Sequence, residues 1–251
     1  MNRVAIVTGA GTGIGAATAR RLAADGLDIV VVGRRSTTLE EVAGGLGGRS
    51  LVVVADLGDA AGPGTIVERT LAEFGRIDVI VNNAAVVAES TLDSVTRPAF
   101  DEHYAVNVGG PMFLLAQAHD ALRRAEDASI INISSSVGSI IKPGTALYGS
   151  TKAALEYLTR AWAYELAPDG IRVNAIAPGP VDTPIHATYS DDLASTYADL
   201  ARRIPLNRMG QPEDVAGWVA FLAGPQSRWT TGTVIHVDGG QVLGLPESAG
   251  G

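Results

Sequence analysis

Several features are scarce or missing in this sequence. It contains no cysteine, which excludes disulfide bonds and catalysis by a thiol. Its first apolar run, Val4 to Val7, is too short for a signal peptide, and no run approaches the roughly 20 residues that span a bilayer. Positive charge is in deficit, and the net charge of −8 argues against a nucleic-acid partner. We therefore expect a cytoplasmic protein with no membrane or nucleic-acid partner.

Lysine is almost absent as well. Of the 19 basic residues, only Lys142 and Lys152 are lysines. Lys152 follows Tyr148 by four residues, so on a helix the two side chains emerge on one face, one turn apart. A phenol has a pKa of about 10, and a nearby ammonium lowers that pKa, which makes the phenol a usable proton donor or acceptor. The pair alone is weak evidence, because this spacing occurs by chance in many helices.

Glycine, by contrast, is abundant near the N-terminus. The run Val4 to Val7 predicts a buried parallel strand, and the segment Thr8 to Gly15 after it contains four alternating glycines. A helical pattern then continues through Asp25. Glycines let the backbone approach a pyrophosphate, and a helix N-terminus offers free N–H groups. A plain strand-to-helix turn is the alternative, but four alternating glycines before a helix favour a dinucleotide site.

Together these motifs resemble the short-chain dehydrogenase/reductase family, whose hallmarks are Thr-Gly-x-x-x-Gly-x-Gly and Tyr-x-x-x-Lys. They stand here at Thr8 to Gly15 and at Tyr148 to Lys152. Other segments agree in order and spacing: Asn82-Asn83-Ala84-Ala85, Asn107, Ser134-Ser135-Ser136, Pro178-Gly179 and Val237-Asp238-Gly239-Gly240. The resemblance covers residues 1 to about 242. It implies one α/β Rossmann domain over residues 1–251, with helices on both faces of a seven-stranded parallel sheet of order 3-2-1-4-5-6-7.

The pattern of apolar runs agrees with this fold, because predicted strands and helices alternate. We predict strands near residues 3–8, 28–32, 50–54, 77–81, 129–133, 171–176 and 233–237. We predict helices near residues 14–25, 37–45, 62–74, 98–121, 147–167 and 212–223. Ligands bind such sheets at the carboxyl ends of the strands, where Gly9, Asn83, Ser135 and Pro178 would converge with Tyr148.

The resemblance also implies four catalytic residues. Tyr148 would give a proton to a carbonyl oxygen while the cofactor delivers hydride to its carbon, and Ser135 would hydrogen-bond that oxygen. Lys152 would hold the nicotinamide ribose and lower the pKa of the tyrosine. Asn107 would keep a water in place that links Lys152 to solvent. Ser135 is preferred over its two serine neighbours because the family places its serine about 13 residues before the tyrosine.

The expected cofactor is NADP(H), with NAD(H) as the alternative. A carboxylate that binds the ribose 2′-hydroxyl is expected about 20 residues after the glycines, but Gly33, Arg34 and Arg35 stand there. Two guanidinium groups could clamp a 2′-phosphate, or they could be ordinary solvated loop charges. NADP-preferring members of the family often carry a basic residue in the glycine turn as well, where this chain has Thr12.

The complete cofactor site predicted from the resemblance draws on every strand end near the glycine turn. Asp56 and Leu57 match the family's adenine contact, although a simple strand-end turn would look the same. The predicted residues are Gly9, Gly11, Thr12, Gly13, Ile14, Gly15, Gly33, Arg34, Arg35, Asp56, Leu57, Asn83, Ala84, Ala85, Tyr148, Lys152, Pro178, Gly179, Val181 and Thr183. We predict no metal site.

Substrate walls in this family come from three segments beside the catalytic residues. Here they would be Val86, Val87, Val137, Ile140, Ile141, Leu147, Ile185 and His186. With no Arg or Lys among them, they favour a neutral, fairly apolar ketone or secondary alcohol. Any one of them could instead pack the core, and His186 could be a solvated residue of the lid expected at residues 184–204. We expect disorder in the small, polar tail at 246–251.

Two other functions stay open beside a small-molecule carbonyl reductase. A 3-oxoacyl-acyl-carrier-protein reductase needs basic residues to dock an acidic carrier, yet this chain has Glu126, Asp127 and Asp169 at the places where carrier-type members tend to put them. Three nearby arginines soften that argument. A non-catalytic NADP-binding scaffold or sensor is the other alternative, although such proteins usually lose the tyrosine, lysine or serine. By resemblance we expect a homotetramer, with the Tyr148 helix, the 98–121 helix and the C-terminal strand region at interfaces.

Overall fold

The computed structural model describes residues 2–184 and 192–244. Strands and helices alternate along almost the whole chain, as predicted. The strands are β1 (Val4–Thr8), β2 (Asp28–Gly33), β3 (Ser50–Val54), β4 (Val79–Asn82), β5 (Ser129–Ile133), β6 (Arg172–Pro178) and β7 (Val234–Val237). The α-helices are α1 (Gly13–Ala24), α2 (Ser36–Gly44), α3 (Gly62–Phe74), α4 (Arg97–Tyr104), α5 (Gly110–Leu122), α6 (Ala146–Leu166), α7 (Leu193–Ala201) and α8 (Pro212–Ala223).

All seven strands form one parallel sheet in the order β3-β2-β1-β4-β5-β6-β7, which confirms the predicted topology. Ile6 at the middle of β1 pairs with Val30 on one side and with Ile80 on the other. The central strands are buried along their full length, because helices cover both faces of the sheet. This explains their continuous Val and Ile runs.

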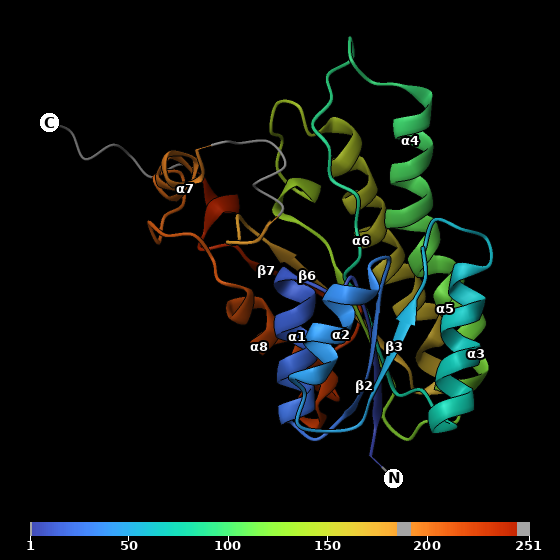
Figure 1. The fold of residues 1–251 in the computed structure, drawn as a ribbon. Coiled ribbons are helices and arrows are strands. Elements are labelled where there is room, and N and C mark those ends of the chain that lie inside the picture. Colours follow the sequence, from blue (N-terminus) through green and yellow to red (C-terminus); the bar gives the residue numbers. More distant parts are fainter. Residues whose placement is uncertain (1, 185–191, 245–251) are drawn as a thin grey trace, which may run out of the picture.

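Each face of the sheet has its own core. On β1, Val4 and Ile6 join the core beneath α3, α5 and α6, while Ala5 and Val7 join the core beneath α1, α2 and α8. This division follows from the strand geometry, since successive side chains point to opposite faces. Figure 1 shows these two groups of helices on the two sides of the sheet. Because helices cover both faces of the sheet, a site can form at the carboxyl ends of the strands.

The segment predicted as a helix at 98–121 is helical throughout, but it contains a π-helical turn that was not predicted. Helices α4 and α5 are separated by a π-helical turn, Ala105–Gly109, which carries Asn107. The wider turn accompanies side-chain bonds from Asn107 to a neighbouring loop, and such turns are common at functional sites. The expected lid contains a helix that was not predicted, α7. Lid residues 185–191 and the tail at 246–251 lie outside the described residues.

No helix within the described ranges is long and apolar enough to cross a membrane. The 21 residues of α6 include the charged Lys152, Glu156, Arg160 and Glu165. In the same parts of the chain, no group of three or more His, Asp or Glu side chains is arranged to hold a metal ion.

Candidate active site

One cavity of about 960 Å³ opens at the carboxyl ends of the strands. It brings together the glycine turn after β1, the loops after β2, β4, β5 and β6, the start of α6, and α7. Almost all the site residues predicted from sequence line it. The exceptions among the described residues are Gly15, Asn107 and Leu147, whose positions are given below. Residues from Gly9 to Gly244 therefore share one site, because the carboxyl ends of parallel strands meet at one edge of the sheet.

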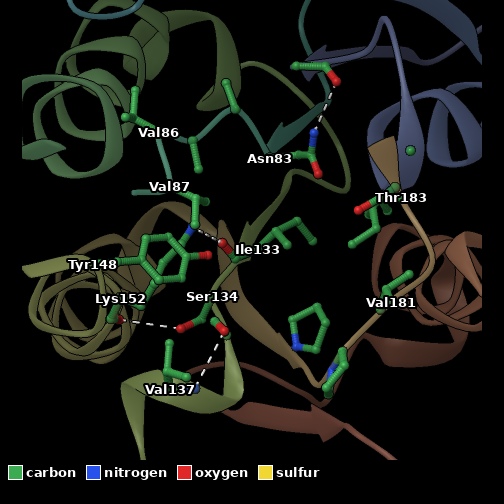
Figure 2. Close-up of a pocket in the computed structure, with 18 of the residues that line it drawn as sticks. Asn83, Val86, Val87, Ile133, Ser134, Val137, Tyr148, Lys152, Val181 and Thr183 are labelled. Carbon is green, nitrogen blue, oxygen red and sulfur yellow. Dashed lines mark hydrogen bonds between the residues drawn. The ribbon is translucent and has the colours of Figure 1, made fainter. Parts of the chain in front are cut away.

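Asn83 holds the glycine turn in place from the end of β4. Its side-chain amide donates to the carbonyl oxygens of Thr8 (2.8 Å) and Gly9 (3.2 Å). In return the Thr8 hydroxyl accepts from the backbone N–H groups of Asn83 and Ala84. Figure 2 shows Asn83 directed toward this turn across the top of the cavity. Asn83 therefore shapes the turn, beyond the ligand contact predicted from sequence.

The glycines of the turn have distinct physical roles. Gly9 adopts a φ of 65° and Gly13 a φ of 52°, which favour glycine. A Cβ on Gly15 would lie 2.2 Å from the Gly9 carbonyl oxygen, so the turn packs directly on the start of α1 there. Gly15 therefore supports the turn from behind and does not line the cavity.

The start of α1 is suited to an anion. No side chain caps the helix at Thr12, and no acidic residue stands in its first turn, so the free N–H groups and the positive end of the helix dipole face the glycine turn. Gly11, Thr12 and Gly13 line the cavity beside it. This is the arrangement that binds a pyrophosphate, and these residues fit a dinucleotide.

The end of β2 presents positive charge to the same cavity. Gly33, Arg34 and Arg35 line it, and both arginines are exposed. Arg34 lies 3.7 Å from the Asp56 carboxylate, across the gap between the ends of β2 and β3. Leu57, which follows Asp56, also lines this end. One carboxylate and two guanidinium groups therefore line the end of the cavity where an adenosine would lie.

Tyr148 and Lys152 lie at the other end of the cavity. Lys152 is buried, and its Nζ donates to the Ile133 carbonyl oxygen at 2.7 Å, at the end of β5. The same nitrogen lies 5.6 Å from the centroid of the Tyr148 ring. Burial lowers the pKa of Lys152 to about 8, while the negative charge of Glu156 acts in the opposite direction. Figure 2 shows the ring and the ammonium side by side at the cavity wall.

The structure distinguishes the three consecutive serines after β5. All three line the cavity, but Ser134 and Ser136 are buried, whereas Ser135 is half-buried. The Ser134 hydroxyl is engaged with Glu156 at 2.7 Å. Within the described part of the chain, Ser135 Oγ has one long contact, from the N–H of Val137 at 3.4 Å. Ser135 is therefore the serine best placed to bond a ligand, as the family spacing predicts.

Asn107 is buried behind the cavity wall. Its side chain accepts from the Val86 N–H (2.8 Å) and donates to the Val86 carbonyl oxygen (2.9 Å) and to the Thr151 hydroxyl (3.0 Å). It therefore ties the loop after β4 to α6, next to Lys152. The water that it is expected to hold stays a prediction.

The substrate walls agree with the sequence in part. Val86, Val87, Val137 and Ile140 line the cavity, and Ile141 lies at its rim, 98% exposed. Leu147 does not line it, so that prediction is wrong. One residue before Tyr148, Leu147 is turned about 100° around α6 and is buried. The predicted residues Ile185 and His186 lie outside the described part of the chain.

Sequence reasoning missed the wall formed by α7 and the C-terminal segment. Thr196 and Leu200, four residues apart on one face of α7, line the cavity together with Arg203 in the turn that follows the helix. Gln241 and Lys142 line it too. Lys142 and Arg203 are therefore basic residues at the cavity that were not placed among the substrate walls from sequence. No motif marks these positions, because only the packing of α7 over the strand ends brings them there.

Comparisons with known proteins agree with this geometry. The sequence model of the family described as "Enoyl-(Acyl carrier protein) reductase" matches residues 9–241. An uncharacterized oxidoreductase of Methylorubrum extorquens is 41% identical over 244 residues, covering 95% of this chain and 97% of that protein. A 3-oxoacyl-[acyl-carrier-protein] reductase of Staphylococcus aureus is 35% identical over 248 residues, covering 97% and 99%. The chain belongs to the short-chain dehydrogenase/reductase family.

A solved structure also supports membership of the short-chain dehydrogenase/reductase family. A 3-ketoacyl-(acyl-carrier-protein) reductase from Brucella melitensis, complexed with NADH, matches with a TM-score of 0.89 and 33% identity, covering 96% of this chain and 98% of that one. The protein is therefore an oxidoreductase that acts on carbonyl or CH–OH groups with a nicotinamide cofactor.

Proposed function

We propose that this protein is an NADPH-dependent reductase that interconverts a ketone and a secondary alcohol on a small, largely apolar substrate. The main support is the Tyr148–Lys152 pair, in which Lys152 Nζ lies 5.6 Å from the centroid of the Tyr148 ring. The pair lines the same cavity as the uncapped start of α1. A proton donor with an adjacent cation thus stands at one end of a site that fits a dinucleotide at the other. The Val86, Val87, Val137 and Ile140 walls support an apolar substrate.

In this proposal each side chain has a defined task during reduction. A nicotinamide held in the cavity supplies the hydride for the carbonyl carbon. Tyr148 gives its hydroxyl proton to the carbonyl oxygen, so the carbonyl becomes an alcohol and the phenol becomes a phenolate. The Lys152 ammonium stabilises that phenolate, and Ser135 donates a hydrogen bond to the reacting oxygen and orients it. The reverse reaction uses the phenolate as the base.

Charge at the end of β2 supports the preference for NADPH. A carboxylate at this position would hydrogen-bond a ribose 2′-hydroxyl and repel a phosphate, but β2 ends with Gly33, followed by Arg34 and Arg35. Both guanidinium groups are exposed at the cavity and can take up a 2′-phosphate. The ion pair between Arg34 and Asp56 is long, at 3.7 Å, and the Arg34 side chain is 65% exposed, so the pair is weak and a phosphate can compete for the guanidinium.

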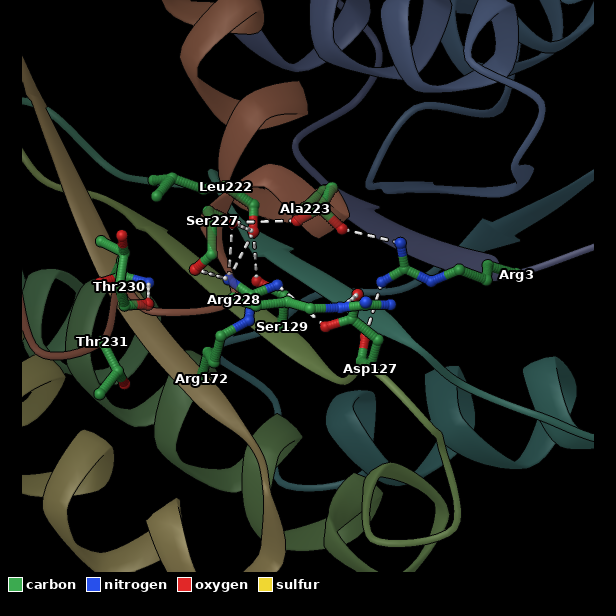
Figure 3. A network of polar contacts seen from close by, with 12 residues as sticks. Arg3, Asp127, Ser129, Arg172, Leu222, Ala223, Ser227, Arg228, Thr230 and Thr231 are labelled. Atoms are coloured by element: carbon green, nitrogen blue, oxygen red, sulfur yellow. Dashed lines mark hydrogen bonds and ion pairs between the residues drawn. The ribbon is translucent and has the colours of Figure 1, made fainter.

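Reduction of acyl-carrier thioesters is the second candidate, and it is favoured by the names of related proteins. The surface that would dock an acidic carrier argues against it. Arg172 is buried, and its guanidinium binds the Asp127 carboxylate (3.3 Å) and the Leu222 carbonyl oxygen (2.9 Å), as Figure 3 shows. Arg123 lies 3.3 Å from Asp169. Arg123 and Arg172, two of the three arginines noted from sequence near these acids, are therefore engaged by acids of the chain itself.

The test is cofactor oxidation at 340 nm with NADPH and NADH against alkan-2-ones, the matching keto acids, diketones and a 3-oxoacyl thioester on a carrier protein. We expect turnover of free ketones with NADPH. The keto acids show whether Arg203, which forms no ion pair with a described residue, accepts a negative end group. Comparable efficiency with both cofactors would contradict the NADPH preference. Activity far higher on the carrier-bound thioester would reverse the order of the two functions.

We also propose a homotetramer. Large apolar side chains are exposed on the segments predicted at interfaces, where they would be covered by other copies. They are Phe100, Met112 and Phe113 on α4 and α5, Tyr157 and Tyr164 on α6, and Trp229 before β7. Trp218 and Phe221 on α8, outside the predicted segments, are exposed as well. Light scattering coupled to size exclusion should give about four times the 25.9 kDa mass of one chain.

A further inference from the structure

A buried carboxylate lies one helical turn beyond Lys152 on α6. Glu156 is only 7% exposed and does not line the cavity. The Ser134 hydroxyl donates to its Oε1 at 2.7 Å. A Cβ on Gly138 would lie 2.7 Å from the same oxygen, so the turn after Ser135 packs directly on the carboxylate. Glu156 is therefore enclosed between α6 and the segment that carries Ser135.

The Lys152 ammonium is the charged group with which the Glu156 carboxylate interacts. The end of β5 contributes only the Ile133 carbonyl, and the π-helical turn contributes the neutral amide of Asn107, bonded to Thr151. On α6 itself, the titratable neighbours are Tyr148 and Glu156. Among the described residues, Glu156 is the charge that acts on Lys152 and opposes the effect of burial on its pKa. A carboxylate and an ammonium buried one turn apart each reduce the cost of burying the other.

We propose that Glu156 is a positioning residue that keeps Lys152 protonated beside Tyr148. The inference rests on the proposed function, in which an ammonium stabilises the phenolate. Without the negative charge, desolvation acts on Lys152 unopposed, so the ammonium loses its proton at a lower pH. A neutral amine gives the Tyr148 phenolate no charge stabilisation. Glu156 has no access to the cavity, so its effect passes through Lys152.

Three variants separate charge from packing. Glu156→Gln keeps the size of the side chain and an oxygen that accepts from the Ser134 hydroxyl, but it removes the charge. Ser134→Ala keeps the charge and removes that hydrogen bond. Glu165→Gln removes an exposed carboxylate from the same helix and serves as the control.

The first measurement is independent of activity. Because the chain has only two lysines, ¹³C-lysine labelling gives two ε-carbon signals, and exposed Lys142 is an internal reference. We expect Lys152 to titrate near pH 8 in the wild type and in Glu165→Gln, and at lower pH in Glu156→Gln, with Lys142 unchanged. An unchanged Lys152 midpoint in Glu156→Gln would overturn the inference, whatever the enzymatic activity.

The second measurement is kcat for ketone reduction as a function of pH. If the Lys152 midpoint moves down by about one unit, kcat of Glu156→Gln falls roughly five-fold at pH 8 and by less than about two-fold at pH 6. A loss of equal size at every pH would indicate a merely structural role and would also overturn the inference. If the wild type reduces no ketone, the proposed function fails, and the lysine titration still decides the role of Glu156.

Discussion

The ammonium of Lys152 lies 5.6 Å from the centroid of the Tyr148 ring, held there by a hydrogen bond to the end of β5. The pair is therefore set by two elements, the turn of α6 that separates the residues and the strand that anchors the lysine. In the proposed mechanism, a cation in this position stabilises the phenolate that forms when Tyr148 gives up its proton.

Replacing Tyr148 by phenylalanine should remove the proton donor and leave the cofactor site intact. We expect kcat/KM for ketone reduction to fall by about 10²–10⁴, the usual contribution of a general acid, while NADPH binding changes little. Steady-state kinetics and fluorescence titration with NADPH measure the two effects. Tyr157→Phe, on an exposed part of the same helix, is the control. Turnover near wild type in Tyr148→Phe would refute the assignment.

Lys152→Met should inactivate the enzyme and stabilise the fold. The pKa of Lys152 is lowered from 10.5 to about 8 on folding, so the folded state binds this proton less tightly than the unfolded state. The resulting destabilisation of roughly 3 kcal/mol is present below pH 8 and disappears as the pH rises through 10.5. We expect Lys152→Met to gain up to about 3 kcal/mol in free energy of unfolding at pH 7, and little at pH 10.5.

Urea denaturation at both pH values measures this difference. Lys142→Met replaces an exposed lysine and should change stability little at either pH. The same ΔΔG for Lys152→Met at pH 7 and pH 10.5 would show that the burial of its charge is not the cause.

Replacing Arg34 and Arg35 together by glutamine should weaken NADPH and spare NADH. Loss of charge-assisted bonds to a 2′-phosphate corresponds to a rise in the KM for NADPH of roughly 10–100-fold. The KM for NADH should stay within about two-fold, since NADH carries no phosphate there. Arg21→Gln removes an arginine that is paired with Asp25 on α1 and lies outside the cavity, so it is the matched control. An equal loss for both cofactors would contradict the proposal.

Two glycine-to-alanine changes should have opposite signs. A Cβ on Gly15 would lie 2.2 Å from the Gly9 carbonyl oxygen and 2.6 Å from Asn83 Nδ2, so Gly15→Ala must displace the glycine turn. We expect a loss of stability of about 1–3 kcal/mol and of NADPH affinity. On α3, a Cβ at Gly64 meets nothing within 4 Å, so Gly64→Ala should stabilise by about 0.5–1 kcal/mol. Thermal melts with and without NADPH compare them, and a neutral Gly15→Ala would argue against the tight packing.

The sequence alone was sufficient for the fold and for the core of the site. Apolar runs predicted all seven strands to within two residues. For the central strands the reason is that strands buried on both faces must be continuously apolar, whereas the edge strands β3 and β7 are only partly buried. The glycine turn and the Tyr148–Lys152 spacing are local patterns whose geometry follows from one turn and one helix. The strand order implied by the family resemblance brings both patterns to the carboxyl ends of the strands, so their placement in one cavity could be predicted.

Other features depended on tertiary packing. The π-helical turn within the predicted 98–121 helix accompanies bonds from Asn107 to the Val86 backbone, 21 residues away, and helical periodicity does not predict it. The wall containing Arg203 exists only because α7 folds over the strand ends. Glu156 acts on Lys152 because Ser134 and the turn at Gly138 enclose it. Periodicity and local motifs determined the helices, the strands and the reacting groups. Contacts between distant segments determined which charged side chains lie beside those groups and which residues form the cavity walls.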